Sequence, residues 1–234
     1  NGLIGFALVL IFLTLFLNLR LSFWVAISIP ISFMGMFLLA AFWGLTINVM
    51  SLFGMIIVIG ILVDDGIVIG ERIYSEYEKG KPALQAAVDG TMSVFPAVVA
   101  AVLTTVVAFS TFFFIDGRLG DFAPDLAFVV VATLLFSLIE GAFILPAHVA
   151  HSKALATKKV KRNRLETTMN KVMVGMRERL YAPVLRFSLR HPVFALSIPI
   201  ALFLITIGGM SNGTIRSTFF PVIERDNIPI NLEM

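Results

Sequence analysis

The sequence predicts an all-α membrane protein, a bundle of six transmembrane helices with an additional amphipathic helix at the cytoplasmic membrane surface. The first observation is the composition: 58% of the residues are hydrophobic and 14% are charged, and the mean hydropathy is +0.94. Soluble domains average about 45–50% apolar and about 25% charged residues. The second observation is six apolar runs, each long enough to cross a hydrocarbon core of about 30 Å. They lie at residues 2–18, 24–43, 50–71, 93–115, 122–148 and 193–211.

The third observation is the uneven distribution of Lys and Arg, which predicts the orientation of the helices. Of 18 such residues, fifteen lie in the connections after the first, third and fifth runs, and three lie on the opposite side. An excess of positive residues marks the cytoplasmic side. We therefore expect residues 72–92 and 153–191 in the cytoplasm, and residues 44–49, 116–121 and the C-terminal tail on the outer side.

The runs and their connections divide the chain into four parts. We assign the first five spans to residues 1–152, a basic linker to 153–191, the sixth span to 192–212, and the start of an outer segment to 213–234. The apolar run begins directly after Asn1, without an initiator Met, a basic leader or a cleavage site, so we expect no signal peptide. The alternation from Ile228 to Met234 is typical of a strand and indicates a piece of a longer protein.

The composition also excludes several kinds of site. The chain has no cysteine, which rules out disulfides, thiolate nucleophiles and zinc–thiolate centres. The three histidines, His148, His151 and His191, lie at the predicted ends of spans and not in a buried cluster. We therefore expect no metal site, no cofactor and no catalytic residues.

The first two spans should form a helical hairpin. Residues 2–18 run inward, and the second span returns outward with Pro30 inside it. A proline removes one backbone hydrogen bond and kinks a helix. Ser28 and Ser32 are near enough in the sequence to satisfy the carbonyl group that Pro30 leaves free.

The third span carries the adjacent carboxyl groups of Asp64 and Asp65 in the middle of an apolar run. Insertion of the pair into a bilayer costs about 5–7 kcal/mol, and the 12 Leu, Ile, Phe and Val residues between Leu52 and Ile69 return about 4–7 kcal/mol. Because this balance is near zero, the pair should face a bundle interior or a wet cavity. Ionisable groups at such depth are candidates for a functional site, here a proton relay.

The same helix carries Gly66 and Gly70, a GxxxG pattern on a different face from Asp64. Small residues at this spacing let helix backbones approach closely, so we interpret the pair as a helix-packing motif. Close packing there would also bring partner groups near the carboxyl groups. After the span, the charged stretch from Tyr74 to Gly90 contains Gly80-Lys81-Pro82, and we expect a short surface helix and a turn.

The fourth and fifth spans add further polar candidates. Thr104 and Thr105 lie in the fourth span, where hydroxyl groups usually donate to the carbonyl four residues earlier or join helices together. A proton-relay role for these two is the alternative. Glu140 lies within the fifth span, six residues before Pro146, so it should be protonated, paired or hydrated. It is a candidate for a secondary relay or for a structural acid that forms hydrogen bonds in its neutral form.

The basic linker predicts a helix that lies flat on the inner leaflet. Apolar residues recur there every three or four positions, with Arg and Lys between them: Leu165, Met169, Val172, Met173, Met176 and Leu180. Such a helix binds lipid through its apolar face and through basic side chains, which contribute about 1 kcal/mol each near an anionic membrane. We expect membrane lipid and not nucleic acid as its partner. His191-Pro192 should then begin the last span.

Several landmarks together resemble a known family. They are Asn18-Leu19-Arg20, Gly44-Leu45-Thr46-Ile47-Asn48, Phe53-Gly54-Met55, the run from Gly60 to Val68 that contains both aspartates, and Thr218-Phe219-Phe220-Pro221. Over nearly its whole length the chain resembles resistance-nodulation-division (RND) efflux transporters of the hydrophobe and multidrug branch. By this resemblance, the six spans correspond to the second to seventh helices of the family.

The resemblance implies a function and partners. Members are homotrimeric pumps of the bacterial inner membrane, with twelve helices and two large periplasmic inserts, and they export amphiphiles in exchange for protons. They work with a periplasmic adaptor and an outer-membrane channel. Asp64 and Asp65 correspond to the proton-carrying aspartates of the fourth helix in this family. The lysine and the hydroxyl groups that complete the mechanism lie on the tenth and eleventh helices, outside this chain.

Two positions depart from the pattern of the family. Gly70-Glu71-Arg72 stands where many members have an acidic residue followed by Asn, although Glu71 preserves the acid. Glu140 stands where the best-known drug pumps are apolar, which suggests a subgroup with different coupling or a different substrate.

The expected mechanism is proton antiport through Asp64 and Asp65. Burial and mutual repulsion disfavour two adjacent negative charges, so at least one of the pair should hold a proton near neutral pH. A cation brought close would release that proton, and its withdrawal would restore it. Alternating access of the pair to the two sides of the membrane would then couple proton entry to helix movement.

Other readings of the sequence stay open. A heavy-metal or lipid exporter of the same superfamily is one alternative, although no Met cluster in the spans indicates a metal relay. A non-transporting or sterol-sensing membrane relative is another. An intramembrane aspartyl protease is remote, because such enzymes place their two aspartates on different helices and the Gly-x-Gly-Asp signature is missing here.

Overall fold

The computed structural model describes residues 2–16, 19–152, 155 and 164–215. Throughout this described part, every regular element is a helix, as expected for an all-α protein. The chain divides into two units, residues 1–170 and residues 171–234. The strand expected from Ile228 to Met234 lies outside the described residues.

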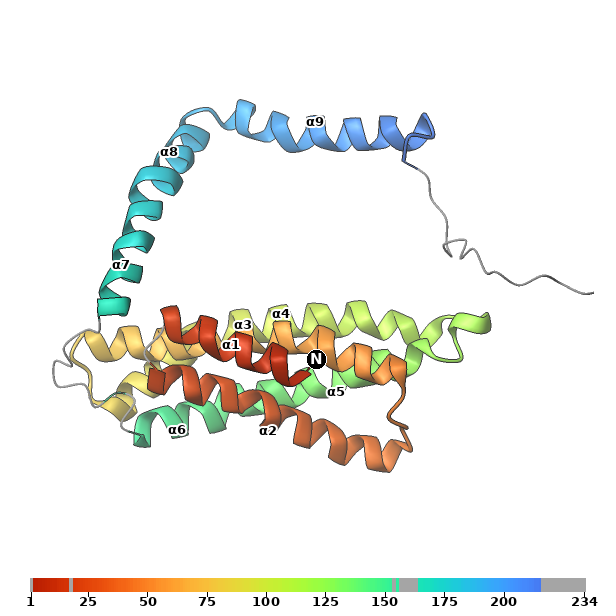
Figure 1. The fold of residues 1–234 in the computed structure, drawn as a ribbon, viewed down its shortest axis with the longest axis horizontal. Helices are drawn as coiled ribbons and strands as arrows, with labels where there is room; N and C mark the ends of the chain where they lie inside the picture. The colour runs from red at the N-terminus through yellow and green to blue at the C-terminus, as the bar shows by residue number, and fades with distance from the viewer. Residues whose placement is uncertain (1, 17–18, 153–154, 156–163, 216–234) are drawn as a thin grey trace, which may run out of the picture. The chain divides into compact units, whose positions relative to one another are not determined.

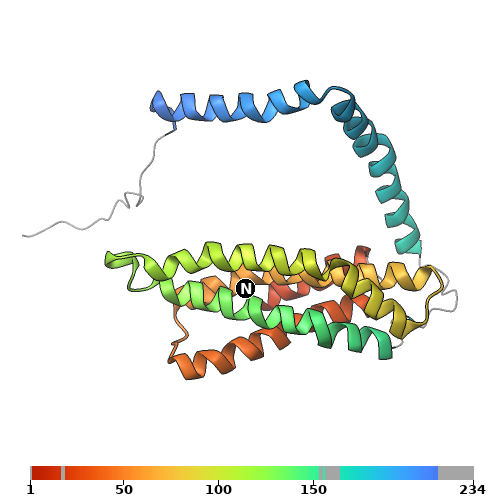
Figure 2. The same ribbon diagram turned by 180° about the vertical axis from the view of Figure 1, so that it is seen from behind.

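The first unit is a helical bundle. It contains α1 (Gly2–Phe16), α2 (Leu19–Trp43), α3 (Val49–Glu78), α4 (Ala83–Ser110), α5 (Ala123–Ile139) and α6 (Leu145–His151). A π-helical turn, Glu140–Ile144, joins α5 to α6, so these elements form one continuous rod. Two short 3-10 turns, Thr111–Phe114 and Gly117–Leu119, connect α4 to α5. Figures 1 and 2 show α2, α3, α4 and α5 running lengthwise beside one another.

Five helical segments of the described chain are long and apolar enough to cross a membrane. They are Leu19–Trp43, Val49–Glu78, Ala83–Phe114, Ala123–His151 and Pro192–Ser211. They agree in order with the second to sixth predicted spans, and they make this chain a multi-pass membrane protein. Where the sequence predicts the first span, α1 covers Gly2–Phe16, and the residues next to both of its ends lie outside the described part.

Helix α3 lies at the centre of the bundle and packs on α2, α4 and α5. Its buried face is continuous, because Val58, Leu62, Ile69 and Ile73 are each at most 2% exposed and recur at helical spacing. With residues of α2 and α5 they form the main hydrophobic core. The central position of α3 determines what the carboxyl groups in its middle can contact.

The start of α3 is fixed by a capping box. The Asn48 side chain accepts hydrogen bonds from the backbone N–H groups of Met50 and Ser51, and the Ser51 hydroxyl accepts one from the Asn48 backbone N–H. The Asn48 amide also donates to the Asp125 carboxylate in the first turn of α5. The same residue therefore ends the loop before α3 and ties the beginnings of two helices together.

The connection from α3 to α4 differs from the prediction. The sequence suggested a separate surface helix between Tyr74 and Gly90, but α3 continues to Glu78 and α4 begins at Ala83. A tight turn remains between them, with Gly80 at φ +94°, a value that favours glycine. Of the charged residues of this stretch, Glu76, Glu78 and Asp89 are therefore helical, whereas Lys79 and Lys81 lie in the turn.

An ion-pair cluster explains why both helices extend past the apolar runs. The Glu76 side chain is 7% exposed and lies 2.6 Å from the Lys79 ammonium and 2.8 Å from the Lys81 ammonium. Lys81 also contacts the Asp89 carboxylate of α4 at 2.6 Å. Hydrogen bonds to Asp89 and Glu76 raise the pKa of Lys81 above its usual range. Most of the charges that suggested a surface segment are thus paired within the hairpin, and Glu78 remains exposed.

The hydrogen bonds around Pro30 in α2 also differ from the prediction. Pro30 leaves the Ala26 carbonyl without its usual helical donor. The Ser28 hydroxyl donates to the Val25 carbonyl at 2.6 Å, and the Ser32 hydroxyl is buried with no hydrogen-bond partner in the described structure. Of the two serines expected to satisfy the carbonyl that Pro30 leaves free, Ser28 therefore binds the neighbouring carbonyl and Ser32 binds none in the described structure.

The linker contains the predicted helix, which continues across the boundary between the units. It runs through α7 (Arg164–Met176), a π-helical turn (Arg177–Tyr181) and α8 (Ala182–Arg190). Its position on a membrane surface stays a prediction. In the second unit, His191 breaks the helix at φ −125° and ψ 65°, and α9 (Pro192–Ser211) begins at the proline, as the sequence predicts. The Phe187 ring contacts the His191 and Phe194 rings across this break.

We predict that Gly90→Ala destabilises the bundle by about 1–3 kcal/mol, the usual cost of an overpacked contact. A Cβ at Gly90 would lie 2.7 Å from the Ile73 Cα and 2.8 Å from the Ile73 nitrogen, so α3 and α4 would have to separate. The measurement is the unfolding temperature of the purified chain in detergent. Gly60→Ala is the control, because no atom lies within 4 Å of a Cβ there. Equal unfolding temperatures for the two variants would contradict the close crossing.

Candidate functional site

A small cavity lies inside the bundle at the middle of α3. Its volume is about 10 Å³, counted as space for the centre of a water molecule, so it has room for about one water. Residues of α2, α3, α4, α5 and the π-helical turn line it. The polar lining residues are Ser28, Asp65, Ser137 and Glu140, and the rest of the lining is apolar or glycine. Among the described residues, no basic side chain lines the cavity.

Asp65 reaches this cavity from α3. Leu62 and Ile69, at helical spacing from Asp65, and the adjacent Gly66 are buried and line the same cavity. One residue along an α-helix turns the side chain by about 100°, so Asp64 leaves from a different face. Asp64 is exposed on the surface of this chain, whereas Asp65 is partly buried. The adjacent aspartates therefore lie in different environments, and only Asp65 faces the cavity.

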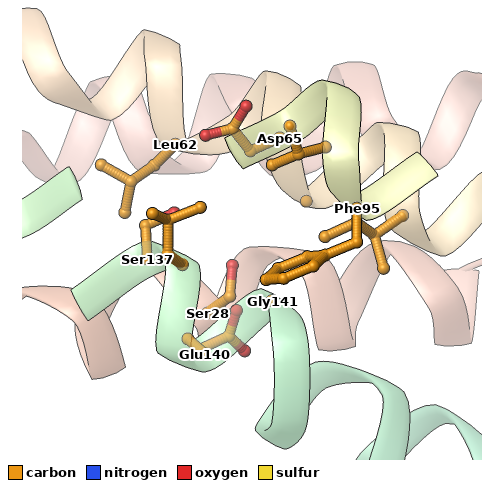
Figure 3. A pocket seen from close by; sticks show the side chains of 11 residues that line it. Ser28, Leu62, Asp65, Phe95, Ser137, Glu140 and Gly141 are labelled. Atoms are coloured by element: carbon orange, nitrogen blue, oxygen red, sulfur yellow. The ribbon is translucent and has the colours of Figure 1, made fainter. Parts of the chain in front are cut away.

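Glu140 reaches the cavity from the first residue of the π-helical turn. The Glu140 carbonyl accepts a hydrogen bond from the backbone N–H of Leu145, five residues later. Pro146 follows directly and has no N–H to continue the regular pattern. The Glu140 side chain is buried, with 3% of the residue exposed. Figure 3 shows Asp65 and Glu140 at opposite ends of the cavity, with Ser28 and Ser137 between them in that view.

The carboxyl groups of the cavity lack hydrogen-bond partners. One oxygen of Asp65 and one of Glu140 are buried without a partner in the described structure. A buried charge that is neither paired nor hydrogen-bonded is costly, and a buried carboxyl group escapes this cost by holding a proton. The arrangement can therefore bind and release protons, or accept a hydrogen bond from a water in the cavity.

Close helix packing closes one side of the cavity. An added Cβ at Gly66 would lie 3.1 Å from a Val25 methyl group and 3.6 Å from the Ser28 hydroxyl, and one at Gly70 would lie 3.1 Å from the other Val25 methyl group. Both glycines thus let α3 approach α2. Gly141 similarly lies beside Ile69. The glycine spacing that indicates packing in the sequence lies where the two helices meet.

The two threonines of α4 do not reach the cavity. The Thr104 hydroxyl donates to the Ala100 carbonyl at 2.7 Å, and the Thr105 hydroxyl donates to the Ala101 carbonyl at 3.0 Å. Both bonds run to the carbonyl four residues earlier, as is usual for hydroxyl groups in membrane helices. In this chain neither threonine contacts the carboxyl groups, so no contact supports a relay role for Thr104 or Thr105.

Sequence reasoning did not identify Ser137, Ser28 or Phe95 as cavity residues. Ser137 is 8% exposed and precedes Glu140 by three residues, so a serine one turn before a buried acid was the available signal. Nothing in the sequence indicates that Ser28 faces the same space, because that depends on how α2 packs against α3. Phe95 of α4 forms part of the apolar wall.

The chain was compared with known proteins. A family model described as the AcrB/AcrD/AcrF family matches residues 1–234. Multidrug resistance protein MdtC of Photorhabdus laumondii subsp. laumondii is 27% identical over 219 residues, which cover 93% of this chain and 21% of that protein. Multidrug export protein AcrF of Escherichia coli K12 is 28% identical over 145 residues, covering 60% of this chain and 14% of that protein.

A further relative is more similar over a shorter stretch. Multidrug resistance protein MdtC of Escherichia coli O139:H28 is 35% identical over 140 residues, which cover 58% of this chain and 14% of that protein. The chain thus spans about a fifth or less of the length of these relatives.

We predict that cysteines placed at the two aspartates differ in reactivity. The chain has no native cysteine, so single-cysteine variants report one position each. In the purified chain in detergent, Asp64→Cys should react with a small thiol reagent several times faster than Asp65→Cys, because access limits the reactivity of a thiol. Ser137→Cys is the buried control. Equal rates at positions 64 and 65 would contradict the separation of the two side chains.

Proposed function

Because the chain belongs to the AcrB/AcrD/AcrF family, we propose that it forms part of the membrane domain of a proton-driven exporter of hydrophobic or amphiphilic compounds. The family membership and the names of the relatives, which describe multidrug resistance and export, support this function. The chain covers only part of those proteins, so the activity belongs to an intact transporter that contains it.

The observation that carries the proposal is Asp65, a carboxyl group in a membrane-spanning helix that lines a cavity without any basic residue. A carboxylate at that depth is costly, so the group holds a proton unless a cation or water reaches it. Asp64, next to it, is exposed on the surface of this chain. Asp64 is thus positioned to meet a group from elsewhere in the transporter while Asp65 meets the bundle interior.

The proposed mechanism uses the two aspartates as the proton-carrying pair. A cation brought near the pair stabilises the charged form and releases a proton, and its withdrawal favours protonation. The two states place a different charge in the middle of α3. Because α3 packs on α2, α4 and α5, a change in its preferred position is transmitted to the whole bundle. Proton entry would in this way be coupled to helix movement.

The proposed setting is the bacterial inner membrane, with residues 72–92 and 153–191 in the cytoplasm. Residues 44–49, 116–121 and the C-terminal tail would be periplasmic. A homotrimer that works with a periplasmic adaptor and an outer-membrane channel is the assembly that the family implies. The distribution of Lys and Arg supports the orientation.

Each alternative function differs from proton-driven drug export in a property that can be measured or seen in the structure. A heavy-metal or lipid exporter would share the fold and the acid pair and differ in substrate, so substrate assays separate it. A non-transporting relative would show no proton-dependent efflux. An aspartyl protease needs two carboxyl groups around one water, but Asp64 and Asp65 lie on one helix and Asp64 is outside the cavity.

We predict that Asp64→Asn and Asp65→Asn each reduce proton-driven efflux by the intact transporter close to background, because an amide cannot take up and release a proton. The measurement is efflux of an amphiphilic dye from proteoliposomes under an imposed pH gradient. Glu78→Gln, which neutralises an exposed acid at the end of α3, should retain wild-type efflux. Full activity in both aspartate variants would overturn the proposed function.

We predict that single cysteines in the loops report the orientation. Ile47→Cys lies in the loop before α3 and is 68% exposed, and Glu78→Cys lies at the opposite end of that helix. In cells whose outer membrane is permeable, a maleimide that cannot cross the inner membrane should label Ile47→Cys at once. It should label Glu78→Cys only after the inner membrane is opened. The reverse pattern would invert the proposed topology.

A further inference from the structure

Glu140 is a buried acid for which the proposed function gives no role. The residue is 3% exposed, and its Oε1 atom has no hydrogen-bond partner in the described structure. No ion pair of Glu140 occurs among the described residues. A purely structural acid in a bundle would be expected to donate or accept a hydrogen bond that joins two helices, because an unsatisfied buried polar group is destabilising.

The backbone around Glu140 is built to direct this side chain inward. The π-helical turn begins at this residue, and turns of this kind inside helices occur frequently at functional sites. Gly141 follows, and an added Cβ there would lie 2.8 Å from the Ile69 side chain of α3. The glycine thus lets the turn approach α3 at the level of the cavity that Asp65 also lines.

We propose that Glu140 is a second proton-binding group that exchanges a proton with Asp65 through a single water in the cavity. In this step protonated Asp65 gives its proton to the water as the water gives another proton to the Glu140 carboxylate. Protonated Glu140, an intact water and the Asp65 carboxylate result, so charge and atoms balance. This role of Glu140 rests on the proposed function of Asp65 and extends the relay from α3 to the π-helical turn.

The surroundings leave Asp65 as the titratable partner of Glu140. From α2 the cavity receives Ser28, and from α4 it receives Phe95 and Val98, none of which titrates in the relevant range. On α6 the next titratable group is His148, whose ring is stacked on Trp24 at 4.5 Å. A cavity of this size holds about one water, and a hydrogen-bonded water is the link that a proton transfer between separated carboxyl groups requires.

The test uses the intact purified transporter, with Glu140→Gln, Glu140→Asp and Asp65→Asn compared with the control Glu78→Gln. Proton-driven efflux is measured as a function of pH in proteoliposomes. Glu140→Gln should change the pH profile of efflux, because it removes one of the two groups that exchange the proton through the cavity. Glu140→Asp should give an intermediate profile, and Glu78→Gln the wild-type profile.

Infrared difference spectra between low and high pH provide a second readout that a structural role would not change. The wild type should show the carbonyl band of a protonated carboxyl group that disappears in Glu140→Gln and shifts in Glu140→Asp. Asp65→Asn should shift that same band, because the two groups share one cavity. If Glu140→Gln is not recovered as folded protein, the bands of the other two variants decide the outcome.

The outcomes distinguish a failure of the role of Glu140 from a failure of the proposed function. A Glu140→Gln transporter with the pH profile and spectrum of Glu78→Gln would overturn the role of Glu140 and leave Asp65 in place. A band that does not change in either Glu140→Asp or Asp65→Asn would overturn it as well. Unchanged efflux in Asp64→Asn and Asp65→Asn would instead overturn the proposed function itself, whatever the spectra of Glu140 show.

Discussion

Two carboxyl groups are buried in the middle of the bundle without a basic partner among the described residues. Asp65 and Glu140 enter one small cavity from two elements of the bundle, and each has an oxygen without a hydrogen-bond partner in the described structure. An unpaired charge in such a place is far costlier than a neutral acid. A change of charge on either group would therefore work against the packing around it, which a cavity of the same size with apolar walls would not experience.

The packing around α3 holds the carboxyl groups in a defined place. Gly66 lets the helix approach α2 in the middle, and Gly54 lies against the Leu126 carbonyl of α5, with 3.1 Å left for an added Cβ. At one end the Asn48 cap is tied to Asp125, and at the other Glu76 is ion-paired with lysines of the turn. The hydrogen bond and the ion pairs lie at the two ends of the helix, and the close glycine contacts lie between them. These contacts together fix the position of α3, and with it the position of Asp65, within the bundle.

The sequence predicts the helices better than it predicts their limits and contacts. Apolar runs of sufficient length identify spans because the hydrocarbon core requires them, and five of the six expected runs appear as long helices. The end of α3 was predicted wrongly, because the charge of Glu76 alone indicates a residue outside a membrane helix. Its neutralisation depends on Lys81, which lies beyond the turn. Asp65 and Glu140 could each be selected from the sequence as buried acids. Their common cavity could not be predicted, because it depends on how α3 packs against the π-helical turn, and Pro146 alone indicates a break in the helix but not that packing.

The exposure of Asp64 extends the same physical constraint beyond the bundle. Asp64 lies in the middle of a membrane-spanning helix, yet it is exposed on the surface of this chain, and a carboxylate at that depth cannot face lipid without a large penalty. The face of α3 that carries it must therefore meet protein or water in the assembled transporter. Asp65 faces the interior of the bundle and Asp64 faces outward. Two adjacent residues therefore lie beside an internal cavity and an external surface. A cation presented from outside would act on Asp64 directly and on Asp65 through the adjacent charge, and Glu140 would respond to Asp65 in turn. In the proposed relay the three acids would then lie in sequence from the outer contact of α3 to the interior of the bundle.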